Sequence, residues 1–214
     1  MLHAPDLLTS DYAYGLITQL ELKNVPVFST IPEIFSDLAG KENPQGIIAV
    51  VRQKLTALGG LNADSFAWGV AIEQPQDPGN LGTILRTLDA AGADGLIVLG
   101  GGTDIFHPTA VRASMGSLFW KPVVYANLDE FMAWQNVHKY HIYGSSAKGT
   151  VEYRQVKYHS PAILLLGSER EGLTPEALSL CEEVIRLPMH GRATSLNLSV
   201  AAGVLMYEIA HGLK

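Results

Sequence analysis

Short apolar runs alternate with longer amphipathic segments from residue 68 to residue 212, and this alternation narrows the choice of fold. Each apolar run is rich in Val, Ile and Leu and is bounded by Gly, Pro or Asn, as buried strands are. Strands that alternate with helices predict a mainly parallel sheet that is covered on both faces. The expected strands are 68–73, 95–99, 122–125, 141–145, 162–166 and 184–187, and the expected helices are 80–91, 108–117, 128–137, 174–181 and 195–212.

The first fifty residues show the same α/β pattern over a shorter length. The expected helices are 12–23 and 32–38, and the expected strands are 25–28 and 46–51. After them the periodicity is lost and Gly59 and Gly60 are paired, which indicates a linker. We therefore expect a small α/β module at 1–52, a linker at 53–66 and a larger α/β domain at 67–214.

The composition describes an ordered globular protein, because 47% of the 214 residues are hydrophobic and 17% are charged. The single cysteine, Cys181, excludes a disulfide within the chain and fits a reducing compartment. No apolar run is long enough to span a bilayer and the first residues lack the features of a signal peptide, so we expect a cytoplasmic protein. The formal charge of −6 argues against binding nucleic acid through bulk charge, although it leaves room for a local basic site.

Three segments that follow expected strands are rich in glycine and polar residues, and ligands of parallel sheets gather at such strand ends. The segments are 74–87, 167–173 and 189–194. The last leads into the C-terminal helix, whose first turn is expected to hold Ser195 and Asn197. Free backbone N–H groups and positive potential there favour a ligand, but Ser and Asn are also frequent helix caps, so both interpretations stand.

Other features point less directly to a function. The glycines at 100–102 follow a strand, but their spacing is not that of a dinucleotide-binding Gly-x-Gly-x-x-Gly motif, and a plain turn is the favoured interpretation. Arg86 lies among leucines and isoleucines on a helix and is either a surface residue or part of a site. Neither His nor Cys residues cluster at metal-site spacings, and Cys181 and His190 stand apart, so the sequence predicts no zinc site.

Taken in order, three motifs of the chain resemble those of the SpoU (TrmH-like) branch of the SPOUT RNA methyltransferases. The first reads Asn80-Leu-Gly-Thr-Ile-Leu-Arg86-Thr87, the second is the Leu-rich strand and Gly-Ser-Glu-Arg-Glu-Gly loop at 164–173, and the third covers 187–191 and 195–201. The segment 110–119 also resembles the family's intermediate helix. The resemblance spans about residues 67–212 and implies a SPOUT-type α/β knot, whose C-terminal chain is threaded into a trefoil knot.

The N-terminal part resembles the family's small substrate-binding module, which is akin to ribosomal protein L30e. The match is best at 25–35 and 42–51. The family's module usually begins with another strand and helix, which do not precede Met1, so either the chain is truncated or the module is reduced. The resemblance implies a partial, apparently truncated L30e-like module that binds the RNA substrate. A second departure is Arg170, where the family more often has glycine. Its side chain would either crowd the cofactor loop or contact phosphate.

The resemblance implies an enzyme that transfers a methyl group from S-adenosylmethionine to a ribose 2′-hydroxyl of structured RNA, with ribosomal RNA favoured over transfer RNA. It also implies a homodimer that packs through the C-terminal helix, without a metal or a membrane. By analogy Arg86 is placed at the 2′-hydroxyl, and because arginine stays protonated we expect it to clamp phosphate and ribose. The implied catalytic set is Arg86, Asn80, Glu169, Ser195 and Asn197, and the implied cofactor-binding set is Leu166, Gly167, Gly172, Leu187, Met189, Gly191 and Leu196.

Two other classes of function stay open at this point. A non-catalytic RNA-binding relative is the alternative if Arg170 blocks the cofactor, and calorimetry with S-adenosylmethionine distinguishes it from an enzyme. A nucleotide-dependent oxidoreductase that uses the glycines at 100–102 is the other alternative, and a nicotinamide-binding assay tests it.

Overall fold

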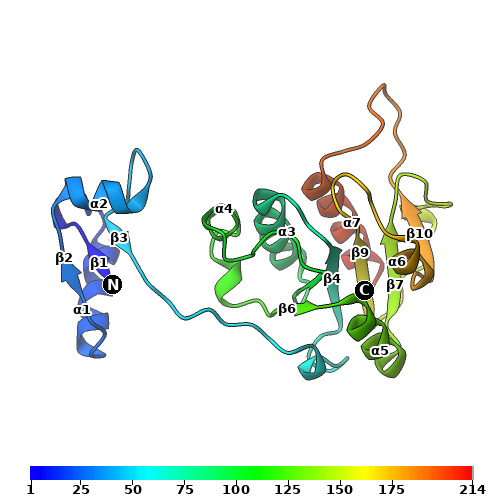
Figure 1. Cartoon of the computed structure of the whole chain (residues 1–214), viewed down its shortest axis with the longest axis horizontal. Coiled ribbons are helices and arrows are strands. Elements are labelled where there is room, and N and C mark those ends of the chain that lie inside the picture. The colour runs from blue at the N-terminus through cyan, green and yellow to red at the C-terminus, as the bar shows by residue number, and fades with distance from the viewer. Residues whose placement is uncertain (214) are drawn as a thin grey trace. The chain divides into compact units, whose positions relative to one another are not determined.

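The computed structural model describes residues 1–213, and the chain divides between Gln53 and Lys54 into two compact units (Figure 1). Within the described residues, the first unit holds a three-stranded sheet and the second a seven-stranded sheet. The same residues include no helix that is long and apolar enough to cross a membrane. The two units are considered separately below.

The first unit is a short α/β arrangement with very small strands. Its central strand β1 (Leu2–His3) pairs in parallel with β2 (Phe28–Ser29) and antiparallel with β3 (Ile47–Ile48). The sequence predicted both α-helices to within one residue at each end, but it missed β1 and extended β3 too far, because two-residue strands leave no alternation to detect. The helices are η1 (Pro5–Leu7), α1 (Asp11–Leu22) and α2 (Pro32–Ala39).

The second unit is built on a sheet in which every pairing is parallel, so the predicted α/β class is confirmed. The strand order is β6-β5-β4-β9-β7-β10-β8. Because all strands run in the same direction, their carboxyl ends lie along one edge. The strands are β4 (Trp68–Glu73), β5 (Leu96–Leu99), β6 (Val123–Ala126), β7 (His141–Ser145), β8 (Val151–Glu152), which the sequence did not predict, β9 (Ala162–Leu166) and β10 (Glu183–Arg186).

The helices of the second unit have well-defined starts. Each α-helix begins after a residue whose side chain accepts a hydrogen bond from the first turn, and three of them also have proline at a first position. The helices are η2 (Leu58–Gly60), α3 (Pro78–Ala91), α4 (Pro108–Ala113), η3 (Ser117–Phe119), α5 (Leu128–His138), η4 (Tyr153–Gln155), α6 (Pro175–Ser179) and α7 (Leu198–Gly212).

These caps explain where the helices differ from the expectation. Helix α3 begins at Pro78, two residues before the expected start at position 80, because Asp77 is its cap. Helix α7 begins three residues late because Asn197 caps it, so the expected start at Ser195 is wrong and neither residue lies inside the first turn. Helix α4 ends at Ala113, well before the expected position 117, because the backbone enters the left-handed region shortly after it.

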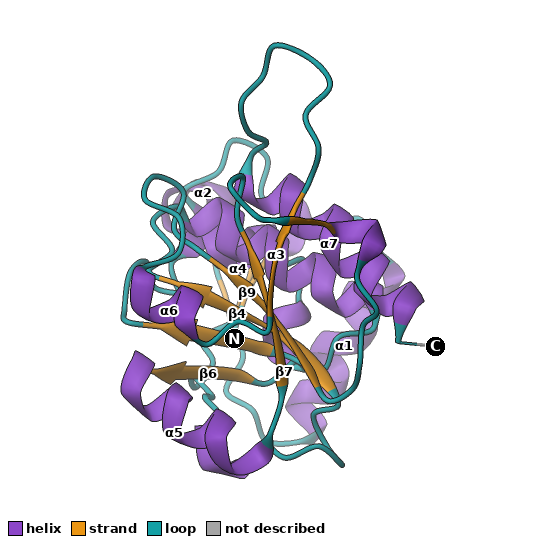
Figure 2. Cartoon of the chain, turned by 90° about the vertical axis from the view of Figure 1, so that its right-hand side faces the viewer, coloured by secondary structure: helices purple, strands orange, loops and turns teal. Residues whose placement is uncertain are grey.

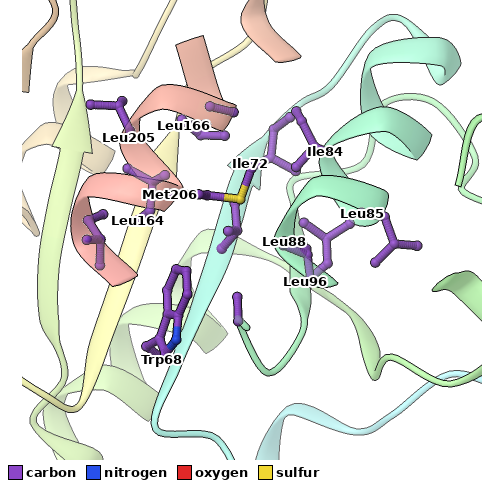
Figure 3. Close-up of a cluster of buried hydrophobic side chains, with 14 of the residues drawn as sticks. Trp68, Ile72, Ile84, Leu85, Leu88, Leu96, Leu164, Leu166, Leu205 and Met206 are labelled. Carbon is purple, nitrogen blue, oxygen red and sulfur yellow. The ribbon is translucent and has the colours of Figure 1, made fainter. Parts of the chain in front are cut away.

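Two hydrophobic clusters lie on opposite faces of this sheet, because successive side chains of a strand alternate. Along β4, Val70 and Ile72 belong to one cluster and Ala71 to the other. Helices α3, α4 and α7 contribute to the first cluster and α5 and α6 to the second (Figure 2). In the first cluster, Met206 of α7 points toward Ile72 and the side chains of α3 (Figure 3). Helices α3 and α7 are thereby fixed side by side.

Within the segment that we expected to be a linker, residues 58–66 pack on the second unit. The carbonyl oxygen of Leu61 accepts a hydrogen bond from the indole N–H of Trp134 over 3.1 Å. Leu61 and Phe66 are both buried in the cluster that contains α5. Burial of these apolar side chains fixes this part of the segment despite the paired glycines beside them.

Candidate functional site

A chain of three polar side chains links separate segments at the carboxyl edge of the large sheet. Asn80 of α3 donates through Nδ2 to Oε1 of Glu169 over 3.1 Å, and its Oδ1 accepts from Nδ2 of Asn197, also over 3.1 Å. Glu169 lies in the loop after β9 and Asn197 caps α7, at sequence separations of 89 and 117 from Asn80. Folding therefore joins three of the five residues that the resemblance places in the catalytic set.

The carboxylate of Glu169 also holds the segment that precedes α3. Its Oε2 accepts the backbone N–H of Gln76 over 2.9 Å, and its Oε1 accepts that of Asp77 over 3.2 Å. Burial alone would raise the pKa of this carboxyl, but the N–H donors of Gln76, Asn80 and Asp77 outweigh burial and hold the pKa below its ordinary value. Glu169 is therefore an anion at neutral pH, and its oxygens are committed to N–H groups.

The loop after β9 is folded tightly onto itself. Ser168 and Gly172 exchange two backbone hydrogen bonds of 3.1 Å each. A Cβ atom on Gly167 would lie 2.1 Å from the carbonyl carbon of Gly172, and the φ of Gly172 is +73°. Both positions require glycine, the first for the close approach of two backbone segments and the second for its left-handed conformation. The conformation of this loop is therefore set by the chain itself.

A buried carboxylate that the sequence analysis missed anchors the other end of the same loop. Glu73, the last residue of β4, is 5% exposed and accepts hydrogen bonds from N of Thr174 over 2.9 Å and from its Oγ1 over 2.7 Å. Thr174 in turn caps α6. The sequence feature that could have indicated Glu73 is its position as one acidic residue at the end of an otherwise apolar strand, directly before the first glycine-rich segment.

The loop between β10 and α7 has a different character, because it extends away from the second unit, as the orange segment of Figure 1 shows. Every residue from 190 to 197 is exposed, whereas Leu187 is half-buried against the core. Within residues 1–213, no hydrogen bond joins positions 187–196 to the rest of the chain. The structure therefore does not bring this part of the expected site to the polar chain, namely Met189, Gly191, Ser195 and Leu196.

Arg86 lies on an exposed side of α3 and outside the polar chain. It follows Asn80 by six residues, which corresponds to about 9 Å along a helix and to a different face. The next residue, Thr87, has its Cγ2 3.6 Å from where a Cβ on Gly203 of α7 would lie. The contact with α7 is thus made by the residue after Arg86, and the arginine itself is exposed.

The glycines at 100–102 pack against the segment between β4 and α3. All three have positive φ, and a Cβ atom on Gly102 would lie 2.3 Å from the carbonyl oxygen of Pro75. The N–H of Thr103 donates to that same oxygen over 2.7 Å. Protein backbone therefore fills the position where a dinucleotide phosphate would approach, and this favours a structural turn over a nucleotide site.

Two remaining features of the expected site concern charge and metals. Arg170 is exposed at the turn of the loop after β9, where solvent surrounds its side chain. In the part of the chain that the structure describes, no group of three or more His, Cys, Asp or Glu residues is placed to hold a metal ion.

A parallel sheet whose carboxyl edge gathers glycine-rich loops around a fixed carboxylate is typical of α/β proteins that bind a small ligand there. The sequence pattern of the SpoU rRNA Methylase family matches residues 68–207, which include the whole polar chain. The chain belongs to this family, and the resemblance drawn from the three motifs is confirmed.

Named relatives and solved structures agree with this assignment. A 23S rRNA (uridine(2479)-2'-O)-methyltransferase of Streptomyces viridochromogenes is 34% identical, over 83% of this chain and 64% of that protein. The 23S rRNA (guanosine(2553)-2'-O)-methyltransferase RlmP of Bacillus subtilis is 32% identical, over 83% of this chain and 69% of that protein. The crystal structure of an AdoMet-bound rRNA methyltransferase from Sinorhizobium meliloti has a TM-score of 0.90 and 32% identity, covering 100% of this chain and 79% of that one. The chain thus spans about two-thirds of the length of the two relatives.

Proposed function

We propose that this chain transfers a methyl group from S-adenosylmethionine to a ribose 2′-hydroxyl of RNA, with ribosomal RNA as the substrate. The observation that carries the proposal is the hydrogen-bonded chain Glu169–Asn80–Asn197, which ties the three family motifs together at the carboxyl edge of the sheet. Two relatives support this substrate class, since both are named 23S rRNA 2'-O-methyltransferases.

The residues at the strand ends fit the cofactor by their chemistry. The tight loop after β9 presents backbone groups that suit the polar atoms of S-adenosylmethionine, while half-buried Leu187 and Met189 offer apolar surface to adenine. The bound cofactor supplies an activated methyl group on a sulfonium. We further infer that both loops lie in the family's trefoil knot and that the exposed loop closes over the cofactor. The proposed contacts are Leu166, Gly167, Gly172, Leu187, Met189, Gly191 and Leu196.

Glu169 is proposed to organise the site rather than to accept the proton of the 2′-hydroxyl. Its pKa is depressed, so the carboxylate is a weak base. Three N–H groups already use its two oxygens. Its role is therefore to hold the first motif against the second, with Asn80 extending that link to the cap of α7. Ser195 would join this group once the third loop closes.

Arg86 is proposed to clamp phosphate and ribose of the substrate. Guanidinium stays protonated in proteins and its planar fork matches phosphate oxygens, so it suits binding better than proton transfer. It is exposed on α3, where an incoming RNA strand can reach it. In a chain of formal charge −6, such a cation supplies a local basic site.

A second copy of this chain is the proposed partner of α7. Val200, Val204 and Tyr207 are exposed and share one side of that helix, opposite the side that packs on the sheet. Because α3 adjoins α7 near Thr87, a partner that covers this stripe would approach Arg86. The homodimer would therefore help to enclose the substrate site.

The first unit is proposed to be an L30e-like module that contacts RNA. Residues 1–53 contain six acidic and three basic side chains, so any binding through them would rest on few phosphate contacts and fall steeply with salt. We place the protein in the cytoplasm, where its RNA substrate is found.

Single-turnover methylation of ribosomal RNA by Arg86→Ala tests the role of the arginine. We expect the rate to fall by about 100-fold or more, as is typical when a key electrostatic group is lost. Calorimetry should show nearly unchanged affinity for S-adenosylmethionine, and Arg86→Lys should restore little, because a point charge lacks the fork. Arg154→Ala, which removes an exposed arginine beside Tyr153, should keep the normal rate as the matched control.

The function itself is tested by transfer of a labelled methyl group to ribosomal RNA. Alkaline hydrolysis then locates the label, because a 2′-O-methyl group protects the adjacent phosphodiester from cleavage. Cofactor binding without methyl transfer would overturn the proposed enzymatic activity and favour the RNA-binding alternative. Label on a base would overturn the assignment of the 2′-hydroxyl.

A further inference from the structure

The indole of Trp120 is held at its edge by a charged network. Its Nε1 donates to Oδ2 of Asp89 over 3.1 Å. Oδ2 also accepts from Oγ of Ser117 over 3.3 Å, and Oδ1 pairs with Nζ of Lys121 over 3.3 Å. Because Asp89 belongs to α3, this network attaches the indole to the helix that carries the first motif.

The backbone at Gly116 supports one side of the same ring. A Cβ atom at this position would lie 3.0 Å from Cζ3 and 3.2 Å from Cη2 of Trp120. Gly116 has a φ of +97°, in the region that favours glycine. The edge hydrogen bond and the supporting backbone together fix the orientation of the indole.

Despite these two constraints, Trp120 is 60% exposed, whereas Trp68 and Trp134 are 8% and 6% exposed in the core. Met115 and Phe119, on the same turn, are 67% and 60% exposed. Large apolar side chains are seldom left open together unless they contact a partner. A fixed, open indole is suited to stacking on another planar group.

The charges around Trp120 indicate what kind of planar group fits. Arg86 precedes Asp89 by three residues on α3, so the two side chains are neighbours on the helix surface, with Cβ atoms about 5–6 Å apart. Arg112 is exposed at the end of α4. The carboxylate that contacts Trp120 is already neutralised by Lys121. A planar partner that carries negative charge is therefore favoured.

We propose that the exposed indole of Trp120 stacks on a nucleobase of the RNA substrate, beside the nucleotide whose phosphate and ribose Arg86 holds. The inference rests on the proposed function for the identity of that RNA. Stacking uses the face that every base possesses, so this contact adds affinity without choosing a sequence. It also extends the RNA-binding surface from α3 onto the turn at η3.

Tryptophan fluorescence of the full chain tests the stacking without any methyl transfer. Trp120 is the exposed one of the three tryptophans, and a stacked base should quench its emission when oligoadenylate is added. The same titration of Trp120→Phe, whose remaining tryptophans are buried, should show no quenching. Equal quenching in both proteins, or none in the wild type at concentrations where oligoadenylate binds, would overturn the proposal.

Kinetics with ribosomal RNA provide the second readout. Trp120→Ala should raise KM for RNA by about 5- to 150-fold, the range for loss of one stacked base, while kcat stays within about 2-fold. Trp120→Phe should retain most of the affinity because it keeps an aromatic face. If the wild type transfers no methyl group, the proposed function fails while the quenching result still decides the stacking. A fall in kcat at constant KM for Trp120→Ala would overturn the proposed stacking.

Two further measurements separate stacking from a structural role. Calorimetry with S-adenosylmethionine should give the wild-type affinity for Trp120→Ala, which shows that the second unit is folded. Sedimentation should give the same oligomeric state for both proteins. A change of oligomeric state would assign the Trp120 surface to a contact between copies of this chain and overturn the proposal.

Discussion

The loops after β9 and β10 leave the same edge of one parallel sheet, yet only the first is held along its length by hydrogen bonds to the rest of the described chain. Around the first, the Ser168–Gly172 backbone pair, the Glu169 carboxylate and the Glu73–Thr174 link fix the backbone at several points. The second is exposed from residue 190 to residue 197 and is attached at its ends, by Leu187 against the core and by Asn197, which caps α7 and donates to Asn80.

The difference indicates which half of the proposed cofactor site is ready before a ligand arrives. Backbone fixed by its own hydrogen bonds loses little conformational entropy on binding, whereas an exposed loop must be ordered at that moment. We therefore expect the loop after β9 to determine whether S-adenosylmethionine binds and the loop after β10 to determine how tightly. Changes made in matched positions of the two loops test this division.

The largest effect is expected from Gly167→Val. A side chain at this position would overlap the backbone of Gly172, since even its Cβ would lie 2.1 Å from the carbonyl carbon. The loop must move by about an ångström, and we expect affinity for S-adenosylmethionine to fall by about 100-fold or more. Calorimetry measures the affinity, and circular dichroism checks that the sheet persists.

Gly191→Val is the matched change in the exposed loop. Nothing lies within 4 Å of a Cβ atom there and its φ is not in the left-handed region, so the melting temperature should stay close to the wild-type value. Gly167→Val should lower it by several degrees. Equal melting temperatures for the two variants would mean that the loop after β9 is no more fixed than its counterpart.

A smaller, pH-dependent effect is expected from Glu169→Gln. An amide cannot accept from all the N–H groups that the carboxylate holds, so the variant should lose about 1–2 kcal/mol of stability at neutral pH. Chemical denaturation at a series of pH values measures the loss. Glu171→Gln, which changes an exposed carboxylate of the same loop, should cost little and serves as the control.

The sign of the pH dependence follows from the depressed pKa of Glu169. A carboxyl with a lower pKa in the folded state stabilises that state fully above its ordinary pKa of about 4.5, and the contribution is lost as the pH falls through the depressed value. The wild type and Glu169→Gln should therefore differ most near pH 7 and converge as the pH falls through the depressed pKa of Glu169. A gap that widens in acid would contradict the assigned network.

The elements with long periodic patterns were predictable from the sequence. Buried strands such as β4 and β9 are uninterrupted apolar runs, and helix α3 shows a regular apolar stripe, so their existence and parallel order followed. The motifs also marked Asn80, Glu169 and Asn197 as site residues. Other residues could not be predicted because they act through contacts that form only on folding. Examples are the hydrogen bond between Glu73 and Thr174 and the one between Trp120 and Asp89.

The start of α7 shows how local and long-range roles overlap in one residue. Both Ser195 and Asn197 are acceptable caps by type, and the sequence alone favoured the earlier one. The choice of Asn197 places its amide within reach of Asn80, a contact across 117 positions. Local cap preferences carry no information about contacts between residues so far apart in the sequence. For that reason the helix start was predicted wrongly.

The smallest effect is expected from Asn197→Ala, which removes the anchor of the exposed loop. Its Oδ1 accepts from the backbone N–H of Ser199 over 2.9 Å, and loss of such a cap costs about 1 kcal/mol. Asn197→Asp separates the two roles, because a carboxylate still caps the helix but cannot donate to Asn80. We expect Asp to retain most of the stability, measured by chemical denaturation, and to weaken S-adenosylmethionine binding as much as Ala does. If Asp binds the cofactor like the wild type, the link to Asn80 has no part in holding the third motif in place.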